Sequence, residues 1–338
     1  MWTERKLNDL LTTPSEALIR DMATLTGDLM ILGAGGKMGP TLCILAKRAL
    51  EKAGSAARVL AVSRFSDQEA VSLLRAEGVT VCAADLMRRD ALDALPDASN
   101  ILFMAGRKFG TSESACDTWA MNATLPALVT QRFGAARYVA FSTGNVYPAT
   151  NPALGGCTEE VSPEPVGEYA MSALARERVF EYAARHYGAK VLLYRLNYAV
   201  DLRYGVLHDL CERILQEAPI SLGNACFNCI WQGYANEVAL RALLRTTDTV
   251  QRLNVTGPET ISVRYAAEAM GAMLGKSPVF EGEEGARSLL SQSGKCMEWF
   301  GYPGVSLSRL MAWQTQWVRE GGRSLEKPTH FEEQRGQF

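Results

Sequence analysis

The chain has 338 residues, of which 47% are hydrophobic and 21% charged, and its formal net charge is -2. This composition is typical of a globular protein with one large or two ordinary domains, and the lack of a basic stripe argues against nucleic acid as a partner. Residues 1–6 are too polar for a signal peptide, and no apolar run reaches the ~18 residues that span a bilayer. We therefore expect no membrane partner and a cytoplasmic location.

Residues 28–54 predict a strand, a glycine turn and a helix. An apolar run ends at Leu32, glycines follow at three-residue spacing, and apolar side chains then recur at helical spacing to Leu50. Glycines allow the tight turn and the approach of a pyrophosphate, while the start of the helix offers unpaired N–H groups to the phosphates. The turn predicts a dinucleotide site made by Gly33, Gly35, Gly36, Lys37, Met38 and Gly39.

The end of the second predicted strand, residues 58–62, indicates which nicotinamide cofactor fits. Ser63 and Arg64 stand where a carboxylate would take the ribose hydroxyls of NAD. Because arginine can donate a bidentate hydrogen bond to a phosphate, the sequence favours NADP, with NAD possible. A solvated surface arginine is the alternative.

Three further strands and two helices complete an alternating pattern. Ser66 and Glu69 form a capping box that opens a helix to about Gly78, and a helix is expected from about Ser112 to Phe133. Strands are expected at 79–83, 100–105 and 137–142. The alternation predicts an α/β fold with a Rossmann-type doubly wound parallel sheet. Residues after these strands should line the cofactor crevice: Asp85, Leu86, Ala105, Gly106, Arg107 and Lys108.

Three sequence motifs occur along the chain in the order that is typical of a known family. The Gly33/Gly36/Gly39 turn precedes Thr143 to Tyr147 and a helix that Tyr169 opens. With these marks the sequence resembles the extended short-chain dehydrogenase/reductase superfamily, of the NAD(P)-dependent epimerase/dehydratase type. The resemblance implies that Tyr169 is the acid/base, that Thr143 bonds the same substrate oxygen, and that Tyr169 and Asn122 adjoin the cofactor.

The family's helix carries a lysine four residues after the tyrosine, and this chain has Ala173 there. An isolated tyrosine titrates near ~10, so it needs a nearby positive charge to ionise at neutral pH. Three explanations stay open. Lys108 or Arg107 supplies the charge, Tyr169 acts only as a neutral donor or leaves the proton to another group, or the protein has lost activity and kept nucleotide binding.

The substrate side is expected after a sixth strand at residues 190–196. Amide, aromatic and cationic side chains are suited to a hydroxyl-rich or acidic substrate. The candidates are Thr143, Asn145, Asn197, Arg203, Tyr204 and Trp231. Cys226 and Cys229 have no second ligand pair at a fitting spacing, so no metal site is expected.

Together these features predict residues 1–197 as an NAD(P)-binding domain, with a return of about 228–256, and 198–338 mainly as a smaller C-terminal α/β substrate lobe and tail. The expected function is an NAD(P)-dependent oxidoreductase or epimerase acting on a hydroxyl or carbonyl of a sugar or sugar-acid-like substrate. The alternatives are an NADP-binding sensor without turnover and a sugar dehydratase using Glu159, Glu160 or Glu168. A homodimer is possible on this sequence.

Overall fold

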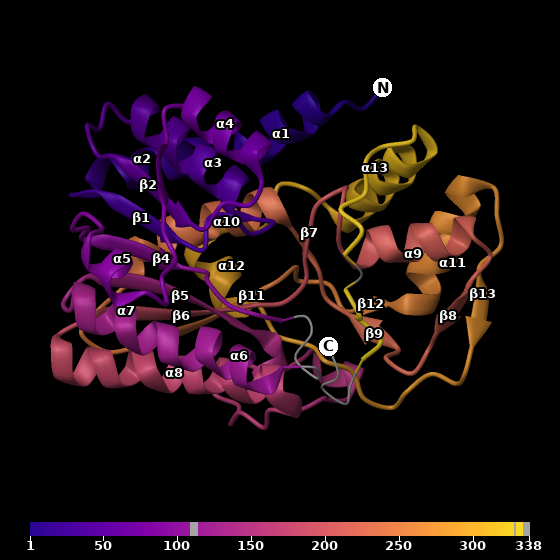
Figure 1. Ribbon diagram of the computed structural model, residues 1–338. Helices are drawn as coiled ribbons and strands as arrows, with labels where there is room; N and C mark the ends of the chain where they lie inside the picture. The colour runs from indigo at the N-terminus through magenta and orange to yellow at the C-terminus, as the bar shows by residue number, and fades with distance from the viewer. Residues whose placement is uncertain (109–113, 328, 334–338) are drawn as a thin grey trace.

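A parallel sheet of seven strands lies at the centre of the computed structural model, which describes residues 1–108, 114–327 and 329–333 (Figure 1). The strand order is β11-β6-β5-β4-β1-β2-β3. The chain runs outward from β1 on one side and from β4 on the other, so the order reverses between them and a crevice opens at their carboxyl ends. The predicted Rossmann-type sheet is confirmed. Its strands are β1 (Leu29–Leu32), β2 (Val59–Ser63), β3 (Thr80–Ala83), β4 (Asn100–Phe103), β5 (Arg137–Thr143), β6 (Lys190–Leu196) and β11 (Gln251–Val255).

Both faces of the sheet are buried, as their nearly continuous apolar strands require. Ile31 and Leu102 belong to the core of one face, and Met30 and Ile101 to the core of the other. The first face is covered by α2 (Glu16–Thr24), α3 (Gly39–Lys52), α4 (Gln68–Ala76), α10 (Gln232–Arg241) and α12 (Gly294–Phe300). The second is covered by α5 (Arg89–Asp93), α7 (Leu125–Phe133) and α8 (Gly167–Tyr187).

A second, smaller core lies beside the carboxyl end of the sheet (Figure 1). It is built on α9 (Val206–Leu215), α11 (Val263–Leu274) and α13 (Leu307–Arg319). Short strands pair here: β7 (Ala199–Val200) with β10 (Ile230–Trp231), β8 (Pro219–Ser221) with β13 (Val279–Glu281), and β9 (Cys226–Phe227) with β12 (Ile261–Ser262). The N-terminal helix α1 (Glu4–Thr12) and the residues just before it join this core. Trp2, which precedes the helix, has its ring 5.4 Å from that of Trp313, centroid to centroid. The division at residue 197 stays a prediction.

Two predicted helices need correction, one at its start and one in its course. Asp67, not Ser66, caps α4, because its carboxylate accepts the N–H groups of Glu69 and Ala70 and suits the positive end of a helix dipole. The helix expected to end at Phe133 is interrupted: α6 (Ala115–Trp119) passes into a π-helical segment (Ala120–Thr124) before α7. Its expected start at Ser112 lies outside the described residues. Short 3₁₀ segments complete the chain at Gly144–Val146, Pro152–Leu154 and Ala242–Arg245.

The C-terminal segment returns from α13 along the smaller core. The N–H of Leu325 donates to the carbonyl of Arg203, and the fully buried Phe331 packs on Phe227 with 6.3 Å between ring centroids. Asn224 secures it further by donating to the Phe331 carbonyl at 2.7 Å. Among the helices that the structure describes, none is long and apolar enough to cross a membrane.

Candidate active site

The turn between β1 and α3 presents backbone rather than side chains at the crevice. Gly33 has a φ of +91°, and a Cβ there would stand 2.5 Å from the nitrogen of Ala105; a Cβ on Gly39 would collide with the backbone of Ala34. Pro40 lies in the first turn of α3, and no side chain in the described part of the protein caps that helix. The positive end of the helix dipole therefore suits an anion, and the cradle fits the pyrophosphate of a dinucleotide.

We expect Gly39→Ala to weaken nicotinamide dinucleotide binding at least ~10-fold, because the added methyl group displaces the backbone at Ala34 and overpacking costs about 1–3 kcal/mol. Calorimetric titration of the folded variant measures this. Gly304→Ala is the control, since a Cβ there meets open space. Unchanged affinity in Gly39→Ala would contradict the cradle.

The residues predicted for the adenosine side follow β2 and β3. The Ser63 hydroxyl oxygen would stand 2.7 Å from a Cβ on Gly35, so it adjoins the glycine turn, and Arg64 is exposed beside it. Leu86 is buried in the core, and the Asp85 carboxylate accepts the N–H two residues further on. The ends of these two parallel strands therefore bring Ser63 and Arg64 near the cradle, while Asp85 and Leu86 hold the next turn.

Asn122 fixes the loop that follows β4. Its Oδ1 accepts the N–H of Arg107 and its Nδ2 donates to the carbonyl of the same residue, each at 2.9 Å; Nδ2 also donates to Ser172. The π-helical turn around Asn122 aims this amide at the loop, and such turns are frequent at functional sites. The Arg107 guanidinium points away, to Asp117 at 3.2 Å. Of the two candidate charges in this loop, only Lys108 enters the crevice.

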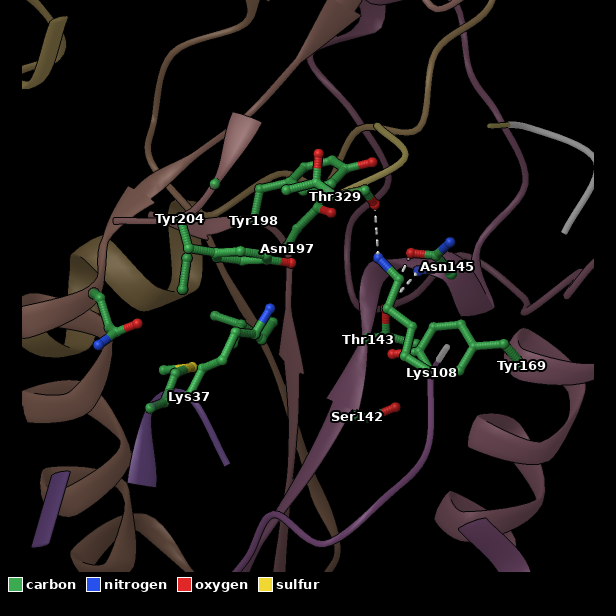
Figure 2. Close-up of a pocket in the computed structure, with 15 residues that line it drawn as sticks. Lys37, Lys108, Ser142, Thr143, Asn145, Tyr169, Asn197, Tyr198, Tyr204 and Thr329 are labelled. Atoms are coloured by element: carbon green, nitrogen blue, oxygen red, sulfur yellow. Dashed lines mark hydrogen bonds between the residues drawn. The ribbon is translucent and has the colours of Figure 1, made fainter. Parts of the chain in front are cut away.

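A cavity of about 150 Å³ opens where the loop, β5 and α8 meet the smaller core (Figure 2). In Figure 2 Lys108 lies between Thr329 and the ring of Tyr169, and Lys37 reaches in from the glycine turn. The structure thus brings together residues predicted from five separate stretches of sequence. The lining consists of Lys37, Met38, Lys108, Ser142, Thr143, Asn145, Tyr169, Leu196, Asn197, Tyr198, Ala199, Tyr204, Gly205, Gln232 and Thr329.

Tyr169 and Thr143 form a hydrogen-bonded pair on the wall of this cavity. Thr143 ends β5 and Tyr169 lies in the first turn of α8. Burial raises the pKa of the Tyr169 phenol, while the hydrogen bond to Thr143 and the charge of Arg176 oppose that rise. The Thr143 hydroxyl donates its one proton to the amide oxygen of Asn145 at 3.1 Å, so Asn145 orients this hydroxyl group.

The two lysines of the cavity are desolvated. Burial lowers the pKa of Lys37 to about 7, with repulsion from Lys108 adding to it, and burial lowers the pKa of Lys108 to about 8. The Lys108 ammonium donates to the Thr329 carbonyl at 3.1 Å and lies 6.0 Å from the centroid of the Tyr169 ring. Both cations make this cavity a favourable place for a negatively charged group.

The opposite wall comes from the turn after β6. Asn197 is buried, and its Nδ2 has no hydrogen-bond partner among the described residues. Tyr198 has a φ of +46°, an uncommon conformation for a tyrosine that holds the turn against the cavity. Lys37 lies against the ring of Tyr204. An unpaired amide and aromatic faces are suited to a polyol.

Two predicted substrate residues lie elsewhere. The Arg203 guanidinium binds Asp201 at 2.6 Å and Glu4 at 2.9 Å, which joins helix α1 to the smaller lobe. Trp231 is buried, with its ring 5.7 Å from that of Trp313 by centroid, and it lines a different cavity. The structure therefore does not bring either side chain to the cavity beside Tyr169.

Among the residues of the site that were not predicted from the sequence, Arg176, Thr329 and Asp209 make the most specific contacts. Arg176 lies behind Tyr169, and its spacing of seven residues, two helical turns, was a usable signal. No signal in the sequence indicated Thr329 or its partner Asp209. The Thr329 N–H and hydroxyl donate to the Asp209 carboxylate at 2.8 and 2.5 Å, across 120 residues of sequence. No cluster of three or more metal-ligating side chains occurs in the part of the chain that the structure describes.

Comparison with known proteins places this geometry in context. The family model described as "NAD dependent epimerase/dehydratase family" matches residues 29–219. No curated protein matches the chain in sequence. Similar solved structures include a UDP-glucose 4-epimerase from Thermotoga maritima with UDP-glucose, which is 17% identical with a TM-score of 0.69 and an alignment covering 87% of this chain and 99% of that one.

Two further structures are similar over the same shares, 87% of this chain and 99% of theirs. A UDP-glucuronic acid 4-epimerase from Bacillus cereus in complex with NAD is 16% identical with a TM-score of 0.68. MoeE5, solved with UDP-glucose and NAD, is 19% identical with a TM-score of 0.68. At these identities the likeness shows the fold.

Proposed function

Because the chain belongs to the NAD-dependent epimerase/dehydratase family, we propose that it is an NAD(P)-dependent oxidoreductase or epimerase acting on a hydroxyl or carbonyl of a sugar or sugar-acid-like substrate. The observation that carries this proposal is the Tyr169–Thr143 pair in a cavity that also receives Lys37 from the glycine turn. A proton-transfer pair therefore adjoins the cradle that would hold the cofactor.

The cofactor supplies a hydride acceptor when it is bound, and the protein's residues supply the rest. The cradle of Gly33 to Gly39 would hold the pyrophosphate, and Ser63 and Arg64 would hold a 2′-phosphate. Asn122 keeps the loop of Arg107 and Lys108 in place beside the cavity.

The protein's own groups manage the proton. During oxidation a hydride leaves the carbinol carbon and the hydroxyl proton passes to Tyr169, so that a carbonyl forms; reduction reverses both transfers. Thr143 holds the same oxygen through its hydroxyl. The Lys108 ammonium, protonated below its pKa of about 8 and 6.0 Å from the centroid of the Tyr169 ring, favours the ionised phenol.

The lining favours an acidic polyol. Asn145, Asn197 and Tyr204 offer amides and a hydroxyl for substrate hydroxyl groups, and Lys37 and Lys108 suit a carboxylate or phosphate. The Thermotoga maritima epimerase and MoeE5 were both solved with UDP-glucose, so UDP-linked sugars belong among the candidates. The cavity of about 150 Å³ is small for such a ligand.

Two alternatives have different support. The absence of the family lysine at Ala173 favours a cofactor-binding protein without turnover. A dehydratase has less support, because Glu159 accepts the N–H of Asn254, Glu168 accepts from the indole of Trp119, and Glu160 is exposed. None of these three carboxylates lines the cavity described above.

The proposal is tested by incubating purified protein with NADP or NAD and a panel of sugars, sugar acids and UDP-sugars. Nicotinamide absorbance follows net oxidation, and chromatography of the products detects epimers when no net reduction occurs. Turnover of any member supports the proposal. A folded, cofactor-bound protein that turns over none of them would favour the sensor.

We expect Arg64→Ala to weaken NADP binding roughly 10- to 100-fold and to leave NAD binding unchanged, because a charge-assisted hydrogen bond to a phosphate is worth about 1.5–3 kcal/mol. Competition calorimetry measures both affinities. Arg75→Ala, which removes an exposed arginine in the last turn of α4, is the matched control. Equal losses for both cofactors, or none for NADP, would remove Arg64 from the phosphate site.

A cytoplasmic location and a homodimer stay predictions of the same proposal.

A further inference from the structure

Arg176 is a buried cation on the same helix as Tyr169. Arg176 lies seven residues after Tyr169 and three after Ala173, so the three side chains share one face of the helix. Ala173 is 1% exposed and Arg176 is 7% exposed. The small alanine leaves the turn between them without a charged side chain, and the arginine stands one turn further on.

The guanidinium of Arg176 is held by neutral oxygen atoms. Its terminal nitrogens donate to the carbonyl of Phe141 at 2.7 Å and to Oδ1 of Asn122 at 2.5 Å. Its Nε is buried without a hydrogen-bond partner in the described part of the structure. Gly106 is required beside it, because a Cβ there would collide with the guanidinium. The loop after β4 is therefore shaped around this arginine.

A buried charge held in this way is costly to maintain. Its neighbour Glu177 is engaged with Arg195 and Ser142 instead. Burial accordingly lowers the pKa of Arg176, while its interaction with the Tyr169 phenol raises it. Arginine nevertheless stays protonated where a lysine would lose its proton, so it can carry a fixed charge at this depth.

We propose that Arg176 takes the place of the family's missing lysine: its fixed positive charge acts on Tyr169 from two turns further along α8 and favours the ionised phenol. This rests on the proposed function and makes Arg176 a positioning residue, since it acts through Tyr169. Asn122 connects the same guanidinium to the Arg107 backbone, so the charge and the cofactor loop are held by one amide.

The test follows the ionisation of Tyr169 directly, by carbon-13 NMR of protein with ring-labelled tyrosine, with the resonance assigned by its loss in Tyr169→Phe. We expect Arg176→Met and Arg176→Gln to raise the pH at which Tyr169 titrates by about one unit or more. In the oxidation direction, the ascending limb of the activity profile, where activity rises as Tyr169 ionises, should move to higher pH by the same amount. Ala173→Lys combined with Arg176→Met should move the titration back toward that of the natural chain.

Tyr169 titrating unchanged in either folded neutral variant would overturn the proposal, as would a shift that Ala173→Lys does not reverse. Arg176→Gln retains an amide donor and keeps the test open should Arg176→Met fail to fold; unfolding of both would assign the arginine a structural role and overturn the proposal too. The NMR titration needs no substrate, so the two proposals fail separately. A shifted Tyr169 titration without any turnover would contradict the proposed function and leave the role of Arg176 standing. Turnover with an unshifted titration would contradict only the role of Arg176.

Discussion

Tyr169→Phe is expected to lower kcat/KM roughly 10²- to 10⁴-fold while cofactor affinity stays within a few-fold of the natural chain's, in line with the loss of a general acid/base. The substitution keeps the aromatic ring and removes the hydroxyl that bonds Thr143. The substrate oxygen then loses both its proton partner and the orientation that the pair provides. Steady-state turnover on the best substrate of the panel, together with calorimetric cofactor titration, measures the two effects separately.

Tyr182→Phe is the matched control, because this tyrosine lies on the same helix, is 54% exposed and stacks on His186 far from the crevice. It should keep full activity. Activity of Tyr169→Phe comparable to that of the control would transfer the proton role to another group and remove the basis of the proposed mechanism.

Arg195→Met should reduce the free energy of unfolding by about 3–5 kcal/mol, the range for breaking a buried ion pair. Arg195 is 1% exposed and donates to both carboxylate oxygens of Glu177, at 2.9 and 2.6 Å. It also donates to the Tyr147 hydroxyl, which in turn donates to Asn254 on β11. The substitution leaves the Glu177 carboxylate buried with Ser142 as its remaining side-chain donor in the described structure.

Denaturant unfolding with linear extrapolation measures this loss. Arg195→Met combined with Glu177→Gln should lose less than the single variant, because no buried charge is then left unpaired. Arg89→Ala breaks an ion pair with Asp93 in which both side chains are about half exposed, and it should lose under ~1 kcal/mol. Similar losses in the buried and the exposed pair would contradict the account of this network.

Local patterns were enough to predict the sheet and the main cavity residues. Glycine spacing and strand ends are short-range signals, and parallel strands necessarily bring their carboxyl ends to one edge. Gly33 and Gly39 could therefore be placed from the sequence, while the resemblance to the family indicated Thr143 and Tyr169. Asn122 could be named, but its π-helical turn could not, since it depends on tertiary contacts with the loop and with Ser172.

The errors arose where long-range partners decide. Arg203 suits an anionic substrate by its chemistry, yet Glu4 and Asn8 reach it from almost 200 residues away. Thr329 forms part of the cavity only because Asp209 holds the C-terminal segment in place. Neither contact leaves a pattern in the local sequence, and both lie in the smaller lobe, where helical and strand periodicity says least about a pocket.

The proposed function requires that this chain binds a nicotinamide dinucleotide in the cradle before α3. Calorimetric titration of purified, cofactor-stripped protein with NADP and then NAD measures that binding. We expect saturable one-to-one binding of NADP, with NAD bound more weakly because Ser63 and Arg64 lack a carboxylate for the ribose. Folded protein that binds neither dinucleotide would contradict the claim.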